Sequence, residues 1–179
     1  MQTQPAIKRP VSGRPSYTIF IGNSFFYYNN GINSHLTKLI AAMDPAYAYR
    51  STMATISGSG LDWHDVESYF RPNAIAKYSF DPDNNVVFNT LDKLFDIAII
   101  MDSSQGPLHP VLAPVFDEYA GKNVATIRKH GAEPVLFMSW AYADKPDMTE
   151  PLCEKYTSAG NALNALVIPA GLAFARSIA

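Results

Sequence analysis

Ser24 is the residue whose place in the sequence most favours nucleophilic chemistry. It stands in Gly22-Asn23-Ser24, directly after the apolar run 17–21 and shortly before a helical pattern. A serine on a tight strand-to-helix turn exposes its hydroxyl, and nearby backbone N–H groups can hold an oxyanion. Gly22 lets the backbone approach closely, and Asn23 tolerates left-handed angles. The alternative is that Asn23 and Ser24 only initiate the next segment, as such residues commonly do.

Three familiar glycine-containing motifs are excluded by their spacing. The tripeptide does not match the Gly-x-Ser-x-Gly elbow of α/β-hydrolases, and no Gly-Lys-Ser/Thr follows Gly22, so it is not a phosphate loop. Gly58-Ser59-Gly60 begins like a dinucleotide fingerprint, but Trp63 stands where the third glycine belongs. We expect this turn instead to offer a backbone N–H to a reaction intermediate.

The histidines and the cysteine argue against a metal or another cofactor. The four histidines lack the spacing of a zinc helix, and Cys153 is the sole cysteine of the chain. His64 and His109 follow two polar loops, so they are candidates for substrate contacts. For each of them the alternative is an ordinary surface or loop histidine.

Strands and helices alternate along the chain and must position these residues. Buried strands are expected at 17–21, 50–56, 96–101, 134–138 and 167–168. Helical patterns cover 32–43, 114–129 and 149–166, and another begins at 172. This alternation predicts a mostly parallel sheet covered on both faces. Ligands of such sheets bind beyond the carboxyl ends of the strands, where the polar segments 22–24, 57–60, 102–105 and 139–140 should converge.

Composition places the chain among globular domains and excludes several partners. Its 179 residues are 47% hydrophobic and 17% charged, and the net charge is −2. That charge lacks the electrostatic footprint of a nucleic-acid binder, and no run reaches the ~18 apolar residues of a membrane span. Residues 1–16, with three prolines, are predicted to be a flexible leader, and 17–179 a single domain. Because no signal peptide is visible, a cytoplasmic location is the default expectation.

An ordered set of segments resembles the SGNH (GDSL-like) hydrolases. Residues 19–25 are similar to the first block of that family, in the variant with Gly-Asn-Ser in place of Gly-Asp-Ser. Residues 56–58 resemble the second block, 96–105 occupy the place of the third, and 134–140 and 167–171 resemble the next core strands. The resemblance implies a flavodoxin-like, three-layer α/β/α sandwich. It also implies a serine esterase that acts through an acyl-serine intermediate on acyl or acetyl esters of a small molecule or glycan.

The resemblance also assigns roles to single residues. Ser24 becomes the nucleophile, and the amides of Ser24 and Gly58 become oxyanion-hole donors. The third donor of the family is an asparagine in a Gly-x-Asn-Asp block, which this chain lacks, so Gln105 or Ser104 is the substitute. Five residues are further candidates for the substrate rim: Asn23, His64, Ser104, His109 and Trp140.

The general base is where the sequence departs from the family. In the family, the catalytic histidine comes from an Asp-x-x-His block near the C-terminus. This sequence contains no such block, and no histidine follows His130. We therefore expect most of an SGNH domain, without that block and the last helix, and little esterase activity. The alternative is a non-catalytic ligand- or carbohydrate-binding domain on the same scaffold, which the aromatic-rich rim also favours.

Overall fold

A five-stranded sheet forms the centre of the computed structural model, which describes residues 3–71, 74–75, 78–88 and 93–178. The strands are β1 (Tyr17–Gly22), β2 (Arg50–Thr55), β5 (Ile97–Ile100), β6 (Glu133–Phe137) and β7 (Leu166–Ile168). They lie in the order β2-β1-β5-β6-β7, and every neighbouring pair is parallel. Counted in chain order within this sheet, that is the flavodoxin-like order 2-1-3-4-5.

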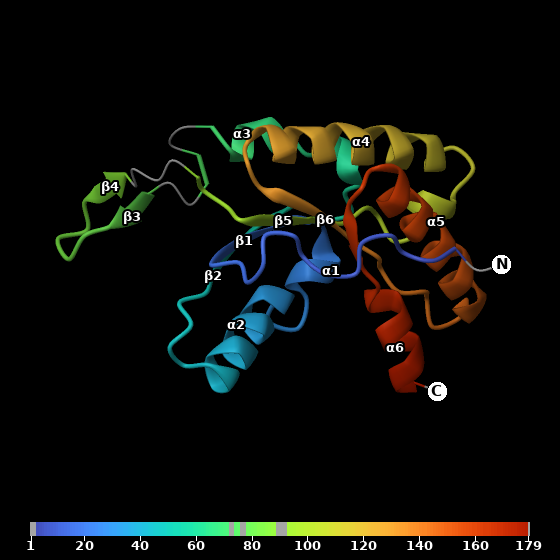
Figure 1. Cartoon of the computed structure of the whole chain (residues 1–179), viewed down its shortest axis with the longest axis horizontal. Helices are drawn as coiled ribbons and strands as arrows, with labels where there is room; N and C mark the ends of the chain where they lie inside the picture. The colour runs from blue at the N-terminus through green and yellow to red at the C-terminus, as the bar shows by residue number, and fades with distance from the viewer. Residues whose placement is uncertain (1–2, 72–73, 76–77, 89–92, 179) are drawn as a thin grey trace.

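Three helices cover one face of the sheet (Figure 1): α3 (Val66–Tyr69), α4 (Ala113–Lys129) and α5 (Thr149–Ala162). Successive side chains of a strand point to opposite faces. In β1, Ile19 and Ile21 therefore join this larger half of the core, which includes Phe116 of α4 and Tyr156 of α5.

The opposite face carries α1 (Ser24–Tyr27), α2 (Ile32–Met43) and α6 (Ala170–Ile178). Phe20 of β1 points to this side, where its ring meets that of Phe26 edge-to-face at 5.4 Å. Phe26 in turn contacts Phe137 of β6 at 5.1 Å. Helices on both faces confirm the predicted three-layer α/β/α sandwich.

The remaining elements lie outside these layers or are single turns. Strands β3 (Tyr78–Phe80) and β4 (Val86–Phe88) form a separate antiparallel hairpin, which projects from the body in Figure 1. Short 3-10 turns are η1 (Leu61–Trp63), η2 (Gly106–Leu108) and η3 (Pro146–Met148). Among the described residues, no helix has both the length and the apolar character needed to cross a bilayer.

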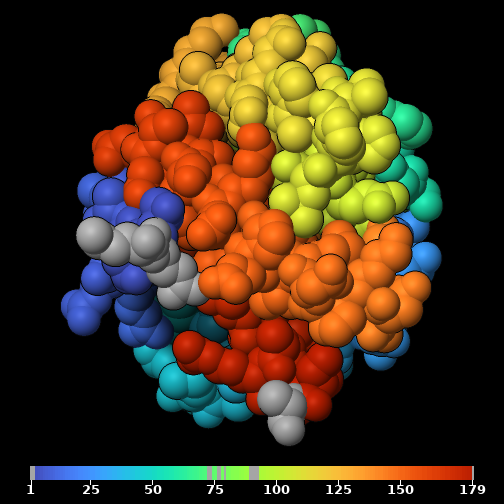
Figure 2. Space-filling view, turned by 90° about the vertical axis from the view of Figure 1, so that its right-hand side faces the viewer, coloured from blue at the N-terminus to red at the C-terminus, as the bar shows by residue number. Residues whose placement is uncertain are grey.

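Residues 3–16 form neither helix nor strand, but they are hydrogen-bonded to the body. The amides of Val11 and Ser12 donate to the Glu133 carboxylate at 2.9 and 2.7 Å, and that of Ser16 donates to Asp96 at 2.8 Å. Figure 2 shows this blue segment beside the orange-red chain that includes α5. Carboxylates at the starts of β5 and β6 thus accept hydrogen bonds from the backbone of this segment.

Candidate active site

Four loops at the carboxyl ends of the strands are joined to one another by hydrogen bonds. The Asn23 side-chain amide donates to the carbonyl oxygens of Ser59 and Asp102, both at 3.0 Å. The Ser139 hydroxyl donates to the carbonyl oxygen of Ser104 at 3.4 Å. The loops after β2, β1, β5 and β6 therefore meet at one edge, which confirms the convergence that the topology predicts.

Ser24 is the first residue of α1 and is half-buried. Asn23 precedes it as the N-cap, and the Asn23 side-chain oxygen accepts from the Phe25 amide at 3.2 Å. The N–H of a first helical residue has no partner within its helix. Across the described part of the chain, no hydrogen bond engages the Ser24 hydroxyl, so the hydroxyl and the amide are both free to meet a ligand.

The turn before Ser24 depends on the small size of Gly22. A Cβ at that position would lie 2.9 Å from the Phe26 ring and 3.3 Å from the Met101 Cβ. The close packing of β1 onto α1 therefore excludes a side chain here.

Gly58 lies at the exposed tip of the loop after β2, with a left-handed φ of 73°. Ser59, fully buried, anchors this tip: its amide donates to the Ile56 carbonyl at 3.2 Å, and its own carbonyl accepts from Asn23. No backbone hydrogen bond within the described ranges uses the Gly58 amide. The residue before Ser24 thus holds the loop that presents Gly58.

Asp102 is buried beneath the loop after β5, with its carboxylate turned inward. It accepts from the Leu61 amide at 3.3 Å and from the Ser103 hydroxyl at 3.0 Å. Burial raises the pKa of Asp102, because a desolvated carboxylate is costly to ionise. Gln105 is exposed nearby, and the Ser104 hydroxyl is hydrogen-bonded to Tyr142.

One of the four histidines, His64, is buried, and the other three are not. His35 contacts the Asn29 carbonyl, His109 accepts from the Val111 amide, and His130 contacts Glu67. Within the residues that the structure describes, none of the four histidines is hydrogen-bonded to Ser24.

His64 and Asn23, two of the predicted substrate contacts, are buried beneath the rim. Their exposed fractions are 5% and 4%, and their polar atoms are bonded to loop backbone or buried side chains. His109 is exposed and faces its own loop, as an ordinary loop histidine does. Burial could not be predicted for His64, because its partners come from β1 and α3.

Trp140 lies at the centre of an aromatic stack. Its ring is 4.5 Å from that of Phe25 and 4.4 Å from that of Phe174, with interplanar angles of 15° and 21°. Two near-parallel phenyl rings at these distances would overlap on one face of an indole, so they cover opposite faces. The stack lines a groove of about 750 Å³, together with Tyr142, Ala175 and Ile178. Phe25, the residue after the candidate nucleophile, is part of this lining, whereas Ser24 itself is not.

Sequence reasoning missed Ser59, Tyr69 and Tyr142 as parts of this region. Ser59 alone had a local signal, since it lies between two glycines after a strand. The two tyrosines contact His64 and Ser104, and neither contact follows from a motif. No group of three or more His, Cys, Asp or Glu side chains that could hold a metal occurs among the described residues.

Solved structures share this architecture. No protein-family model and no curated protein sequence matches the chain. An SGNH hydrolase structure from Slackia heliotrinireducens superposes with a TM-score of 0.60 at 14% identity, over 90% of this chain and 82% of that one. Axe2, an acetylxylan esterase from Geobacillus stearothermophilus, gives 0.62 at 14% identity over 91% and 80%. AlinE4, an SGNH-hydrolase family esterase, gives 0.60 at 13% identity over 90% and 79%. The chain therefore has the fold of the SGNH hydrolases.

Proposed function

We propose that this chain carries the nucleophile and oxyanion hole of a serine ester hydrolase, with Ser24 as the nucleophile. The observation that carries the proposal is the Asn23 side chain, which joins the Ser24 turn to the Gly58 loop and to the loop after β5. The fold supports it, because Axe2 and AlinE4 are esterases. Catalytic mutants of Axe2 replace a serine, an aspartate and a histidine.

The reaction follows from the atoms at the site. The Ser24 hydroxyl oxygen attacks the ester carbonyl carbon, and a base takes the hydroxyl proton. The negative oxygen of the tetrahedral intermediate accepts from the amides of Ser24 and Gly58, each worth about 10²–10³ in rate. The bond to the alcohol oxygen then breaks, the proton passes to the alcohol, and water hydrolyses the acyl-serine.

No histidine of this chain is within hydrogen-bonding distance of Ser24 among the described residues, so the base is the missing part. Residual catalysis from binding and an oxyanion hole amounts to about 10³–10⁴ over water in well-known triads. We therefore expect slow acylation of Ser24 that a small external base accelerates.

The groove lined by Phe25 and Trp140 favours an apolar acyl group over a sugar. Sugars commonly stack on an exposed aromatic face, but Phe25 and Phe174 occupy both faces of Trp140. Ala175 and Ile178 add aliphatic surface to the groove. The ester class that fits is one with an acyl chain of several carbons.

A second candidate function is binding without catalysis on the same scaffold. It is favoured because none of the four histidines is hydrogen-bonded to Ser24 within the described residues; each is bonded to other groups. It predicts that ligands occupy the groove while Ser24 never forms an adduct.

Labelling with a fluorophosphonate probe, read by mass spectrometry, separates the two functions. We expect a single adduct on Ser24 that forms faster when 2-methylimidazole supplies the base, and none in Ser24→Ala. Ser12→Ala is the matched control, because Ser12 is exposed in the leader at the opposite edge of the sheet. Equal labelling of Ser24→Ala, or an unmodified Ser24 with the added base, would overturn the proposal.

A further inference from the structure

His64 connects the end of β1 to the loop that carries Gly58. Its Nε2 lies 3.0 Å from the carbonyl oxygen of Gly22 and 3.0 Å from the hydroxyl oxygen of Ser59. The Ser59 hydroxyl also donates to the Gly22 carbonyl at 3.2 Å. These three residues form a closed polar triangle directly beneath the Ser24 turn.

The partners of the imidazole define its tautomer. A carbonyl oxygen only accepts hydrogen bonds, so Nε2 must carry the hydrogen that points toward Gly22. Nδ1 is then an acceptor, and the Tyr69 hydroxyl, 2.9 Å away, donates to it. A neutral ring fits these contacts when its Nε2 hydrogen is shared between the Gly22 carbonyl and the Ser59 hydroxyl oxygen. Burial favours this neutral form, because it lowers the pKa of His64.

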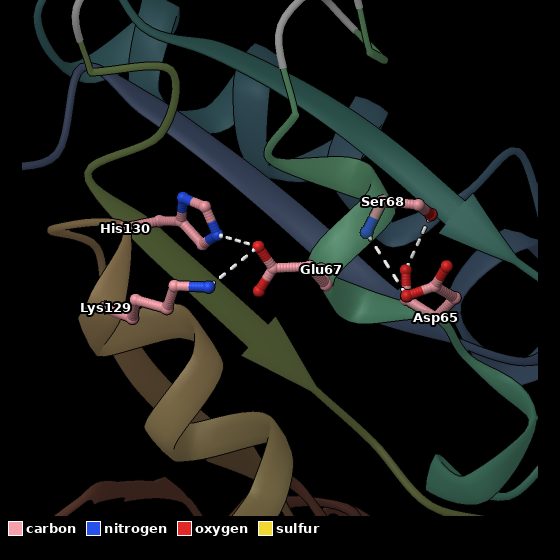
Figure 3. A network of polar contacts seen from close by, with 5 residues as sticks. All are labelled: Asp65, Glu67, Ser68, Lys129 and His130. Atoms are coloured by element: carbon pink, nitrogen blue, oxygen red, sulfur yellow. Dashed lines mark hydrogen bonds and ion pairs between the residues drawn. The ribbon is translucent and has the colours of Figure 1, made fainter.

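Tyr69 is held in place because α3 is joined to α4 through Glu67 and is capped at its start by Asp65. Figure 3 shows Glu67 pointing toward Lys129 and His130 at the end of α4, and one Glu67 oxygen lies 3.0 Å from each. At the start of α3, the Ser68 hydroxyl donates to the Asp65 carbonyl at 2.7 Å.

The residue after Tyr69 adds a second contact to α4. The Phe70 ring stacks on His130 with centroids 5.1 Å apart. The hydroxyl that meets His64 thus belongs to a helix fixed on α4.

We propose that His64 is a positioning residue for the oxyanion hole. His64 holds the 57–60 loop against the end of β1 and so fixes the Gly58 amide relative to Ser24. This role rests on the proposed function. His64 itself does not touch the substrate, since it is buried behind Ser59. Its contribution is to keep a donor in place that would otherwise move with an exposed loop.

Two substitutions separate positioning from simple packing. His64→Gln can keep an N–H directed at the Gly22 carbonyl, whereas His64→Leu fills similar space without any donor. His35→Gln is the matched control, because His35 is exposed on α2 and, among the described residues, its ring is hydrogen-bonded to the Asn29 carbonyl alone. Each protein is measured by amide hydrogen exchange at Ser59 and by the rate of Ser24 labelling with the fluorophosphonate and 2-methylimidazole.

In His64→Leu we expect amide exchange at Ser59 to become about tenfold faster or more, and labelling of Ser24 to become about tenfold slower or more. Displacing an oxyanion-hole donor costs up to that donor's whole contribution to the rate, ~10²–10³. His64→Gln should stay within about threefold of the wild type in both, and His35→Gln should match the wild type. Nitrogen NMR of the wild-type protein should find the hydrogen of His64 on Nε2, a readout that does not require the variants to fold.

Three results would overturn the inference: hydrogen on Nδ1 of His64, unchanged Ser59 exchange in His64→Leu, or equal slowing in His64→Gln and His64→Leu. Faster Ser59 exchange in His64→Leu with no Ser24 labelling in any protein would instead refute the proposed function. In that case His64 holds the loop, but the loop serves no oxyanion hole.

Discussion

The side-chain amide of Asn23 donates to the carbonyl oxygen of Ser59 at 3.0 Å, so the residue before Ser24 holds the loop after the neighbouring strand. A second hydrogen of the same amide goes to the carbonyl of Asp102. One buried side chain thereby joins three strand ends, and the geometry of the candidate site depends on its two N–H donors.

Asn23→Asp should destabilise the protein by about 2–4 kcal/mol, because two buried carbonyls lose their donors and face a carboxylate instead. Asn23 is 4% exposed, so water cannot replace the lost partners. The urea unfolding midpoint measures the effect. Asn33→Asp on α2 is the control, and an equal loss of stability in both variants would contradict this account.

Gly58→Ala should destabilise the fold by about 1 kcal/mol, since an L-residue at a φ of 73° is strained while the space around the Cβ is open. Gly13 offers a matched control, with a φ of 76° and equally open surroundings in the leader. Both alanine variants should lose similar stability in urea unfolding. Only Gly58→Ala should slow Ser24 labelling, and equal labelling rates would remove Gly58 from the oxyanion hole.

Acidification should lower the stability of the wild type relative to His64→Gln. Burial lowers the pKa of His64 from 6.5, and this outweighs the hydrogen bond to Gly22 and the charge of Asp62, which raise it. Below pH 6.5 the unfolded chain therefore binds a proton that the folded chain does not.

The stability from a neutral His64 is thus complete above pH 6.5 and decreases as the pH falls toward the lowered value. The free energy of unfolding then decreases by at most ~1.4 kcal/mol per pH unit. Urea unfolding at several pH values between 8 and 5 measures the difference between the two proteins. A constant difference would contradict a lowered pKa.

Ala175→Phe should reduce acylation of Ser24 by p-nitrophenyl octanoate at least tenfold and leave the acetate ester unaffected, because the new ring fills the groove beside Trp140. Ala173→Phe is the control, since Ala173 is exposed on the same helix outside the groove. Mass spectrometry of the acyl-serine measures both reactions. A parallel loss with both esters would place the acyl chain elsewhere.

The layers of the fold could be predicted because they depend on local pattern. Continuous apolar runs mark β1 and β5, and the apolar stripe from Ile32 to Met43 marks α2, so these elements lie where the pattern places them. The four-residue α1 escaped prediction, since it exists through the Asn23 cap and the packing of Phe26 on Phe137. Such contacts join distant parts of the chain.

The candidate site could be predicted only in its outline. Strand ends located Ser24 and Gly58, because a parallel sheet brings its carboxyl ends together. The burial of His64 depends on Tyr69, whose helix is fixed by ion pairs to α4, and no spacing along the sequence encodes that contact. The same holds for Trp140, whose stacking partners lie in α1 and α6.

We expect the exposed β3–β4 hairpin to promote self-association in concentrated solution. Phe80, Val86 and Phe88 are each at least half exposed, and a short apolar hairpin outside the main sheet invites edge-to-edge pairing between molecules. Asp81 and Asp83 at the tip of the hairpin oppose that approach, because their negative charges repel those of a second molecule. Hydrogen bonds from the Asn85 backbone, the Asn85 side chain and the Asp83 backbone lower the pKa of Asp81, which favours its charged form. Because salt screens such repulsion, self-association should increase with ionic strength, and colloidal stability is greatest in dilute buffer.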